Sequence, residues 1–153
     1  FAYQFVGNFT RVLASRYASF DTEEKAIDFS KKSLMFPTIF SLCLVLLIFI
    51  SNPLVNLLFG VEYHESINVM QILSFGFIAF FLSTIPSSII LYYFGKSNVS
   101  FMITSVRYLF FISLLILFVP QAKALGAAWA FTLSELLSLI LLWGYTFAKF
   151  QKK

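Results

Sequence analysis

The chain has 153 residues, of which 59% are hydrophobic and 12% are charged, whereas ordinary soluble domains carry roughly 25% charged residues. Its net charge of +4 does not indicate a nucleic-acid partner, because the basic residues lie at the ends of apolar segments rather than on one face. The single cysteine, Cys43, excludes a disulfide framework and a thiolate metal cage. Its place in an apolar run predicts a small buried hydrophobic residue.

Residues 1–20 have the pattern of the last part of a transmembrane helix. Apolar residues recur at helical spacing as far as Leu13, and Arg11 and Arg16 are the first charges along the chain. The chain opens with phenylalanine and shows no signal-peptide pattern. We therefore expect the C-terminal part of a longer protein, with residues 1–20 as the end of an upstream span.

Residues 21–33 are polar and charged, which predicts a helix or loop on the cytoplasmic side of a membrane. Asp21 can cap a helix, and Glu24, three residues later, can complete a capping box. Asp28 and Lys32 are one helical turn apart and can form an ion pair.

Four apolar stretches follow, and each is long enough to cross a bilayer, which needs about 20 residues of helix. Residues 33–61 and 66–95 contain no charge, and the two later stretches contain one charge each. The expected transmembrane helices are 34–59, 67–93, 98–119 and 124–148. The sequence therefore predicts an all-α membrane protein with four full spans in the region 34–150, followed by a cytoplasmic tail at 151–153.

Proline and glycine mark the expected ends of these helices. Pro53 should break or kink the first span, because proline removes a backbone donor and clashes with the preceding turn. Gly60 should end that helix in the left-handed conformation. Glu65 or Ser66 should cap the second span, and Pro120 should end the third.

Hydroxyl residues surround the proline in the middle of the second span. Ser83, Thr84, Ser87 and Ser88 flank Pro86. We expect them to hydrogen-bond the carbonyl that proline leaves without a donor, although interrupted helices also build transporter sites.

Small residues along the fourth span predict a close contact between helices. They are Gly126, Ala127, Ala130, Ser134 and Ser138.

Basic residues are distributed unequally between the two ends of the spans. Nine lysines and arginines flank the side of the first segment, and only Lys123 flanks the other side. The nine are Arg11, Arg16, Lys25, Lys31, Lys32, Lys96, Lys149, Lys152 and Lys153. Short cytoplasmic segments carry an excess of Lys and Arg. Both ends of the chain are therefore expected in the cytoplasm.

The charges inside the third and fourth spans are Arg107 and Glu135. Ionisable residues within a span are costly and usually face a bundle interior or a water-filled cavity. Their depths differ by about one helical turn of 5.4 Å, so two long side chains on adjacent antiparallel helices can meet. The two side chains can pair only to neutralise each other's charge, or they can take part in the passage of a substrate or ion. Arg107 can also snorkel to the inner headgroups.

Motifs of soluble enzymes are absent from the sequence. There is no glycine loop for phosphate and no pair of catalytic carboxylates outside the membrane. The one histidine, His64, lies beside Glu62 and Glu65 in a loop, where a solvated histidine needs no role as a metal ligand or proton relay. We expect no enzymatic activity and no cofactor.

Three stretches carry a resemblance to one family. NPLVNLLFGVEYHESINVMQIL (52–73) resembles the outer-loop signature of the polysaccharide-flippase branch of the multidrug/oligosaccharidyl-lipid/polysaccharide exporter superfamily. YYFGKSN (92–98) is similar to the short inner loop of that family, and LGAAWAFTLSE (125–135) is similar to the opening of its last span.

The resemblance implies the C-terminal part of a two-lobe transporter of 12–14 helices in a bacterial plasma membrane. Such a transporter carries an undecaprenyl-diphosphate-linked oligosaccharide from the inner to the outer leaflet, for O-antigen and other polysaccharide biosynthesis, by alternating access. It implies membrane lipids and other polysaccharide assembly proteins as partners, and proton or sodium coupling in some relatives. No site residue is taken over from the family.

Two other readings stay open. The chain can belong to a drug or metabolite exporter of the same superfamily. It can also belong to a membrane-embedded enzyme or an assembly subunit of glycan synthesis, for which this stretch offers only the loop residues Glu62, His64 and Glu65 as polar chemistry.

The charge distribution predicts which loops face outward. A cysteine at His64 should react with an impermeant thiol reagent added to intact cells, and a cysteine at Lys96 should react only after the membrane is opened. The reverse labelling pattern would show that the orientation is inverted.

Overall fold

The computed structural model describes residues 2–151 of the chain, without the side chains of residues 2–6, 23 and 61. The described part is helical and contains no β-strand. Its elements are α1 (Ala2–Tyr17), α2 (Glu23–Ser33), α3 (Met35–Leu58), the short 3-10 turn η1 (Val61–Tyr63), α4 (Glu65–Ser88), the π-helical segment η2 (Ile89–Tyr93) and α5 (Ser97–Gln151). Of the predicted tail, Gln151 is helical and 152–153 lie outside the described residues.

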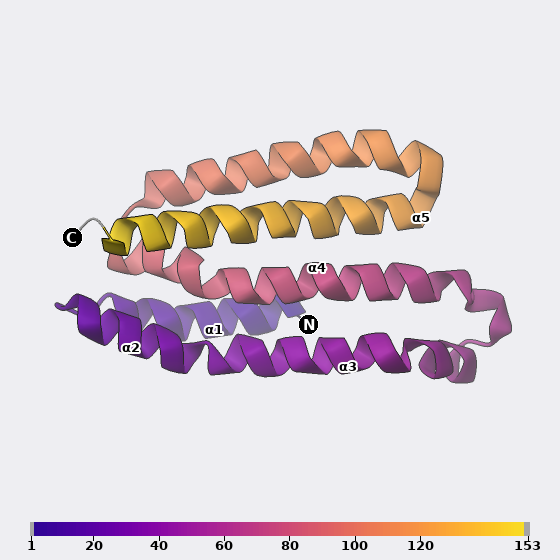
Figure 1. Ribbon diagram of the computed structural model, residues 1–153, viewed down its shortest axis with the longest axis horizontal. Helices are drawn as coiled ribbons and strands as arrows, with labels where there is room; N and C mark the ends of the chain where they lie inside the picture. The colour runs from indigo at the N-terminus through magenta and orange to yellow at the C-terminus, as the bar shows by residue number, and fades with distance from the viewer. Residues whose placement is uncertain (1, 152–153) are drawn as a thin grey trace.

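The helices form an elongated bundle whose members lie along one axis (Figure 1). Within the described residues, three helical stretches are long and apolar enough to cross a membrane: Glu24–Leu58, Glu65–Tyr93 and Ser97–Gln151. The last has 55 residues, far more than the roughly 20 that a bilayer needs. It folds back on itself at Lys123, where φ is 47° and ψ is −121°, so that two antiparallel arms result (Figure 1). Each arm is longer than one bilayer crossing.

The position of this reversal corrects one expectation. Pro120 was predicted to end the third span, but α5 continues through Pro120 to Lys123. A proline removes one backbone donor and bends a helix. It does not reverse the chain, because reversal needs a residue outside the helical region, and Lys123 is that residue.

Pro53 also lies inside a helix, since α3 runs on to Leu58. Next to it, the side chain of Gln71 on α4 donates to the Ser51 hydroxyl at 2.8 Å and to the Ile48 carbonyl at 3.3 Å. Polar side chains thus join α3 to α4 beside the proline. The prediction for Gly60 is confirmed: its φ is 90°.

The predicted side-chain caps are wrong. Thr22, not Asp21, is the N-cap residue of α2, and it makes no side-chain cap bond. The N-cap position of α4 is His64, in helical conformation and again without a side-chain bond. The 3-10 turn leads directly into α4, so no extended residue is placed to cap it. The Asp28–Lys32 ion pair is present at 2.7 Å on the exposed face of α2.

Helix α4 is the centre of the bundle and packs against α1, α3 and α5. On one side, the Phe40 and Phe81 rings stack with centroids 5.5 Å apart. On the other, the Thr132 hydroxyl of α5 donates to the Ile72 carbonyl of α4 at 2.7 Å. Gly76 lies against this contact, because a Cβ there would come within 2.8 Å of Thr132. A small residue therefore lets the two backbones approach.

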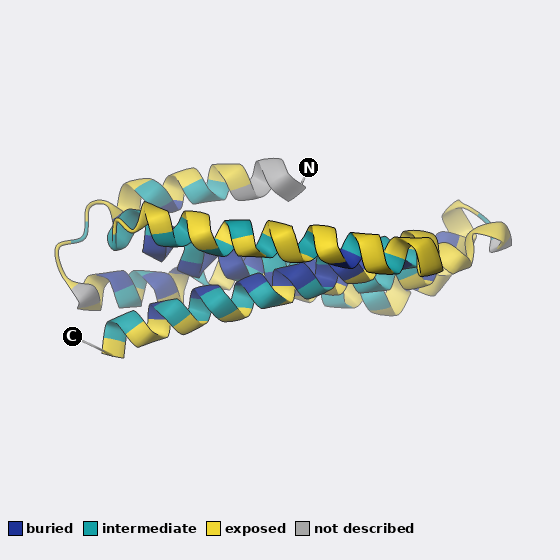
Figure 2. Ribbon diagram, turned by 90° about the horizontal axis from the view of Figure 1, so that it is seen from above, coloured by how far each residue is buried: buried dark blue, intermediate teal, exposed yellow. Residues whose placement is uncertain are grey.

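Exposed residues run along most of the outer surface of the bundle (Figure 2), and many of them are large and apolar. Phe49 is 77% exposed, Leu57 86% and Phe101 75%. Soluble monomers rarely expose contiguous apolar patches larger than a few hundred Å², and lipid is the solvent that suits this surface. Cys43 is exposed on α3, which corrects the prediction that it is buried: its apolar neighbours in sequence face lipid rather than a core.

The close approach of the two α5 arms generates a prediction. A Cβ at Gly126 would lie 2.3 Å from the carbonyl oxygen of Phe118 in the other arm, whereas Gly144 has nothing within 4 Å. Gly126→Ala should therefore push the arms apart and destabilise the protein by about 1–3 kcal/mol, as overpacking does. Gly144→Ala should be neutral or stabilising, since alanine is the better helix former.

Thermal unfolding of the complete protein in detergent measures both effects. Equal midpoints for Gly126→Ala and the unsubstituted protein would contradict the close contact between the arms.

Candidate functional site

The structure brings together the two charges that lie inside apolar helix. Arg107 is on the first arm of α5 and Glu135 is on the second. The guanidinium Nη1 donates to the carboxylate Oε1 at 2.7 Å. The reversal at Lys123 makes this contact possible, because it places the two arms side by side (Figure 1).

Both members of the pair are withdrawn from the surface, but unequally. The side chain of Arg107 is 17% exposed and that of Glu135 is 4% exposed. The second carboxylate oxygen, Oε2, is buried without a hydrogen-bond partner in the described part of the chain. The guanidinium carbon lies 4.6 Å from the centroid of the Tyr108 ring, a cation–π distance. Arginine has five N–H donors, so most of its donor capacity remains available to a ligand.

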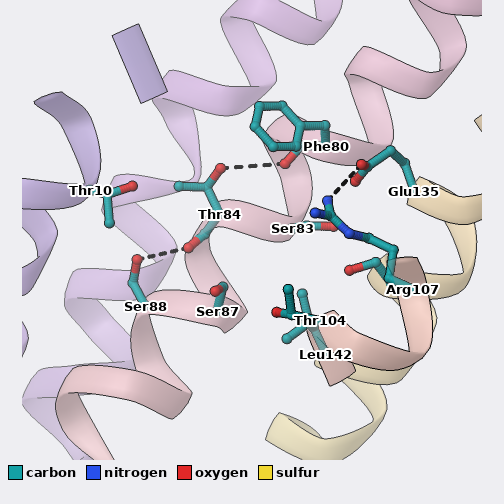
Figure 3. A pocket seen from close by; sticks show the side chains of 11 residues that line it. Thr10, Phe80, Ser83, Thr84, Ser87, Ser88, Thr104, Arg107, Glu135 and Leu142 are labelled. Carbon is teal, nitrogen blue, oxygen red and sulfur yellow. Dashed lines mark hydrogen bonds and ion pairs between the residues drawn. The ribbon is translucent and has the colours of Figure 1, made fainter. Parts of the chain in front are cut away.

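The pair borders a cavity of about 190 Å³ between α1, α4 and both arms of α5 (Figure 3). Seven of its eleven lining residues carry hydroxyl groups. The lining residues are Thr10, Phe80, Ser83, Thr84, Ser87, Ser88, Thr104, Arg107, Glu135, Ser138 and Leu142. A polar cavity is an exception among helices that are otherwise this apolar, and ionisable residues in spans typically face such a cavity.

Three hydroxyls on α4 are used within their own helix. Ser83 donates to the Ala79 carbonyl at 2.8 Å, and Ser88 to that of Thr84 at 2.8 Å. Thr84 donates to the Phe80 carbonyl at 3.4 Å. The carbonyl freed by Pro86 belongs to Leu82, so these serines and threonine do not perform the repair that the sequence suggested. Their oxygens keep lone pairs that can accept hydrogen bonds in the cavity.

Four other hydroxyls are free to donate. Thr10, Ser87, Thr104 and Ser138 line the cavity and make no side-chain hydrogen bond within the described residues. Together with Arg107 they offer donors to an anionic or hydroxyl-rich ligand, as phosphate and sugar groups are.

Sequence reasoning found the two charges but missed the cavity around them. Arg107 and Glu135 could be identified from the sequence because a charged side chain within a membrane span costs free energy. Ser138 was predicted only as a packing residue, and Thr10 and Thr104 were not singled out. Hydroxyls four residues apart on α4, at 83 and 87 and at 84 and 88, share a face of the helix and were the signal that could have shown it.

The remaining polar candidate, His64, is not among the residues that line the cavity. His64 is exposed at the start of α4. Among the described residues, no group of three or more His, Cys, Asp and Glu side chains could hold a metal ion.

Comparison with known proteins gives one relative of stated role. The chain is 33% identical over 140 residues to the capsular polysaccharide biosynthesis protein CapF of Staphylococcus aureus. The alignment covers 89% of this chain and 35% of that protein, so the chain spans about a third of the relative's length. No family model matches the chain, and no solved structure matches it.

The burial of the Arg107–Glu135 ion pair predicts how substitutions at these residues change the stability of the protein. Arg107→Ala and Glu135→Ala each leave a buried charge without its partner, and each should destabilise the protein by about 3–5 kcal/mol. The double substitution should cost less than the sum of the two, because it leaves no unpaired charge. Lys32→Ala, which removes an exposed pair, should change stability by about 1 kcal/mol or less.

The free energies come from denaturation of the complete protein in detergent, combined as a double-mutant cycle. Strict additivity of the Arg107 and Glu135 effects would mean that the pair contributes no coupling energy.

Proposed function

We propose that this chain is part of a membrane transporter that moves undecaprenyl-diphosphate-linked oligosaccharide from the inner to the outer leaflet of a bacterial plasma membrane. The product would serve O-antigen or other surface polysaccharide biosynthesis. The observation that carries the proposal is the Arg107–Glu135 pair at a hydroxyl-lined cavity inside helices apolar enough to cross a membrane. The similarity to a capsular polysaccharide biosynthesis protein supports the glycan class of the substrate.

The chemistry of the cavity suits parts of such a substrate. Guanidinium groups recognise phosphate oxygens through charge-assisted hydrogen bonds, so Arg107 is the proposed contact for the diphosphate. The free hydroxyls of Ser87, Thr104 and Ser138 are the proposed contacts for sugar hydroxyls. At about 190 Å³ the cavity is smaller than sites for drug-sized ligands, which measure about 300–1,000 Å³. It would therefore form one wall of a larger site completed by other parts of the protein.

Transport is proposed to proceed by alternating access, without a cofactor and with a proton or sodium gradient as the source of energy. The chain is proposed to keep its C-terminus in the cytoplasm, as the excess of Lys and Arg on that side favours. Other proteins of polysaccharide assembly are the proposed partners.

Deletion and complementation in the producing bacterium test this function. Cells that lack the protein should lose surface polysaccharide and accumulate lipid-linked oligosaccharide in the inner leaflet. Glycosyl-transfer activity in their membrane extracts should be intact. The unsubstituted gene and Lys32→Ala should restore transport, and Arg107→Ala should not, although its protein is present in the membrane.

Two outcomes would contradict the proposal. Loss of glycosyl transfer in the extracts would indicate an enzyme or an assembly subunit. Normal surface polysaccharide together with increased drug sensitivity would indicate a drug exporter.

A further inference from the structure

A second cavity lies between α2, η2 and the C-terminal arm of α5, and it shares no residue with the cavity at the ion pair. Its volume is about 350 Å³, within the usual range for ligand sites. It is lined by Ile27, Ser30, Lys31, Leu34, Ile89, Trp143, Thr146, Phe147 and Phe150.

The wall of this cavity offers few polar groups to a ligand, because the hydroxyl groups of its serine and threonine already form hydrogen bonds within the protein. Ser30 donates to the Ala26 carbonyl at 2.6 Å and also pairs with the Tyr17 hydroxyl at 2.7 Å. Thr146 donates to the Leu142 carbonyl at 2.8 Å. A ligand in contact with this wall therefore meets aliphatic and aromatic groups.

One cation borders the cavity without a counterion. Lys31 is exposed, and none of the ion pairs among the described residues includes it. The neighbouring Lys32 is different, because its ammonium group contacts Asp28 at 2.7 Å. An unpaired lysine beside an apolar cavity matches a ligand that has both a negative group and a hydrocarbon part.

The cavity lies toward one end of the bundle, a position that fits lipid headgroups. Helix α2 and the C-terminal end of α5 lie at the same end of the bundle (Figure 1). Trp143 is in the cavity wall, and tryptophan is enriched at the membrane–water interface. Basic pockets between membrane helices bind anionic lipid headgroups.

We propose that this cavity binds an anionic glycerophospholipid of the bilayer. An acyl chain enters the apolar cavity, and the Lys31 ammonium group contacts the headgroup phosphate. The inference requires that the chain spans a membrane, but it does not depend on the transport of a glycan.

Tryptophan quenching by brominated lipid tests the site. The complete protein, with Trp143 as its only tryptophan, is placed in phosphatidylcholine nanodiscs that contain a small fraction of dibrominated phosphatidylglycerol or, in parallel, dibrominated phosphatidylcholine. Phosphatidylglycerol should quench Trp143 at a lower mole fraction than phosphatidylcholine. Since a lysine near the surface contributes about 1 kcal/mol toward anionic lipid, and a tenfold change corresponds to 1.4 kcal/mol, the preference should be about fivefold.

Matched variants test whether Lys31 is responsible for the preference for phosphatidylglycerol. Lys31→Gln should abolish it, and Lys31→Arg should retain it. Lys32→Gln removes a neighbouring charge that is already paired and should leave it unchanged. Ile27→Phe, which places a larger side chain in the cavity wall, should fill the cavity and reduce quenching by both lipids. In a second version with Trp129 as the only tryptophan, Lys31→Gln should change nothing.

Three results would overturn the inference. Equal quenching by the two lipids would show that no headgroup is selected. An equal loss of preference in Lys31→Gln and Lys32→Gln would show general surface charge rather than a site. Displacement of the brominated lipid by undecaprenyl phosphate, but not by excess unbrominated phosphatidylglycerol, would show an isoprenoid as the occupant.

Discussion

Hydrocarbon offers no partner to a polar group, and this constraint organises the contacts between the helices. A charge at the middle of a bilayer costs several kcal/mol, so Arg107 and Glu135 must find each other or water. Their contact at 2.7 Å requires the two arms of α5 to be antiparallel and close. The glycine at 126 permits that approach, because a side chain there would strike the backbone of the other arm.

The same constraint links α4 to its two neighbours. Gln71 reaches across to Ser51 and the Ile48 carbonyl on α3, and Thr132 reaches from α5 to the Ile72 carbonyl. Each of these polar bonds lies between helices rather than toward lipid, while large apolar side chains such as Phe49 and Phe101 cover the outside. Helix α4 thus donates to α3 on one side and accepts from α5 on the other. Of the three described stretches that could cross a membrane, the one that contains α4 is the most buried.

Hydroxyl groups give the two cavities different chemistry. In the cavity between α2 and the C-terminal arm of α5, Ser30 and Thr146 donate to carbonyls of their own helices, which leaves an apolar wall suited to an acyl chain. Near the ion pair, Thr104 and Ser138 are not bonded in this way, and an arginine adds further donors. The proposed glycan contact and the proposed lipid contact are thus separate sites with separate ligands. Since the chain spans about a third of the length of CapF, the rest of the glycan site would come from other segments.

The sequence alone determined that this protein consists of long apolar helices, because the length of such a helix follows from the thickness of a bilayer. The thickness of a bilayer requires about 20 apolar residues per helix, and runs of that length can be counted directly. The cost of a charge in such a run also made Arg107 and Glu135 stand out, and the left-handed conformation of Gly60 followed from its place after an apolar helix.

Only the tertiary structure decided which face of each helix meets lipid, a cavity or another helix. Cys43 was therefore predicted in a core that it does not enter, and the serines around Pro86 were assigned to repair rather than to a cavity. The reversal at Lys123 rather than Pro120, and the uncapped starts of α2 and α4, likewise depend on how neighbouring segments meet. Hydropathy specifies how long a helix is, but the direction of its side chains is set by partners distant in the sequence.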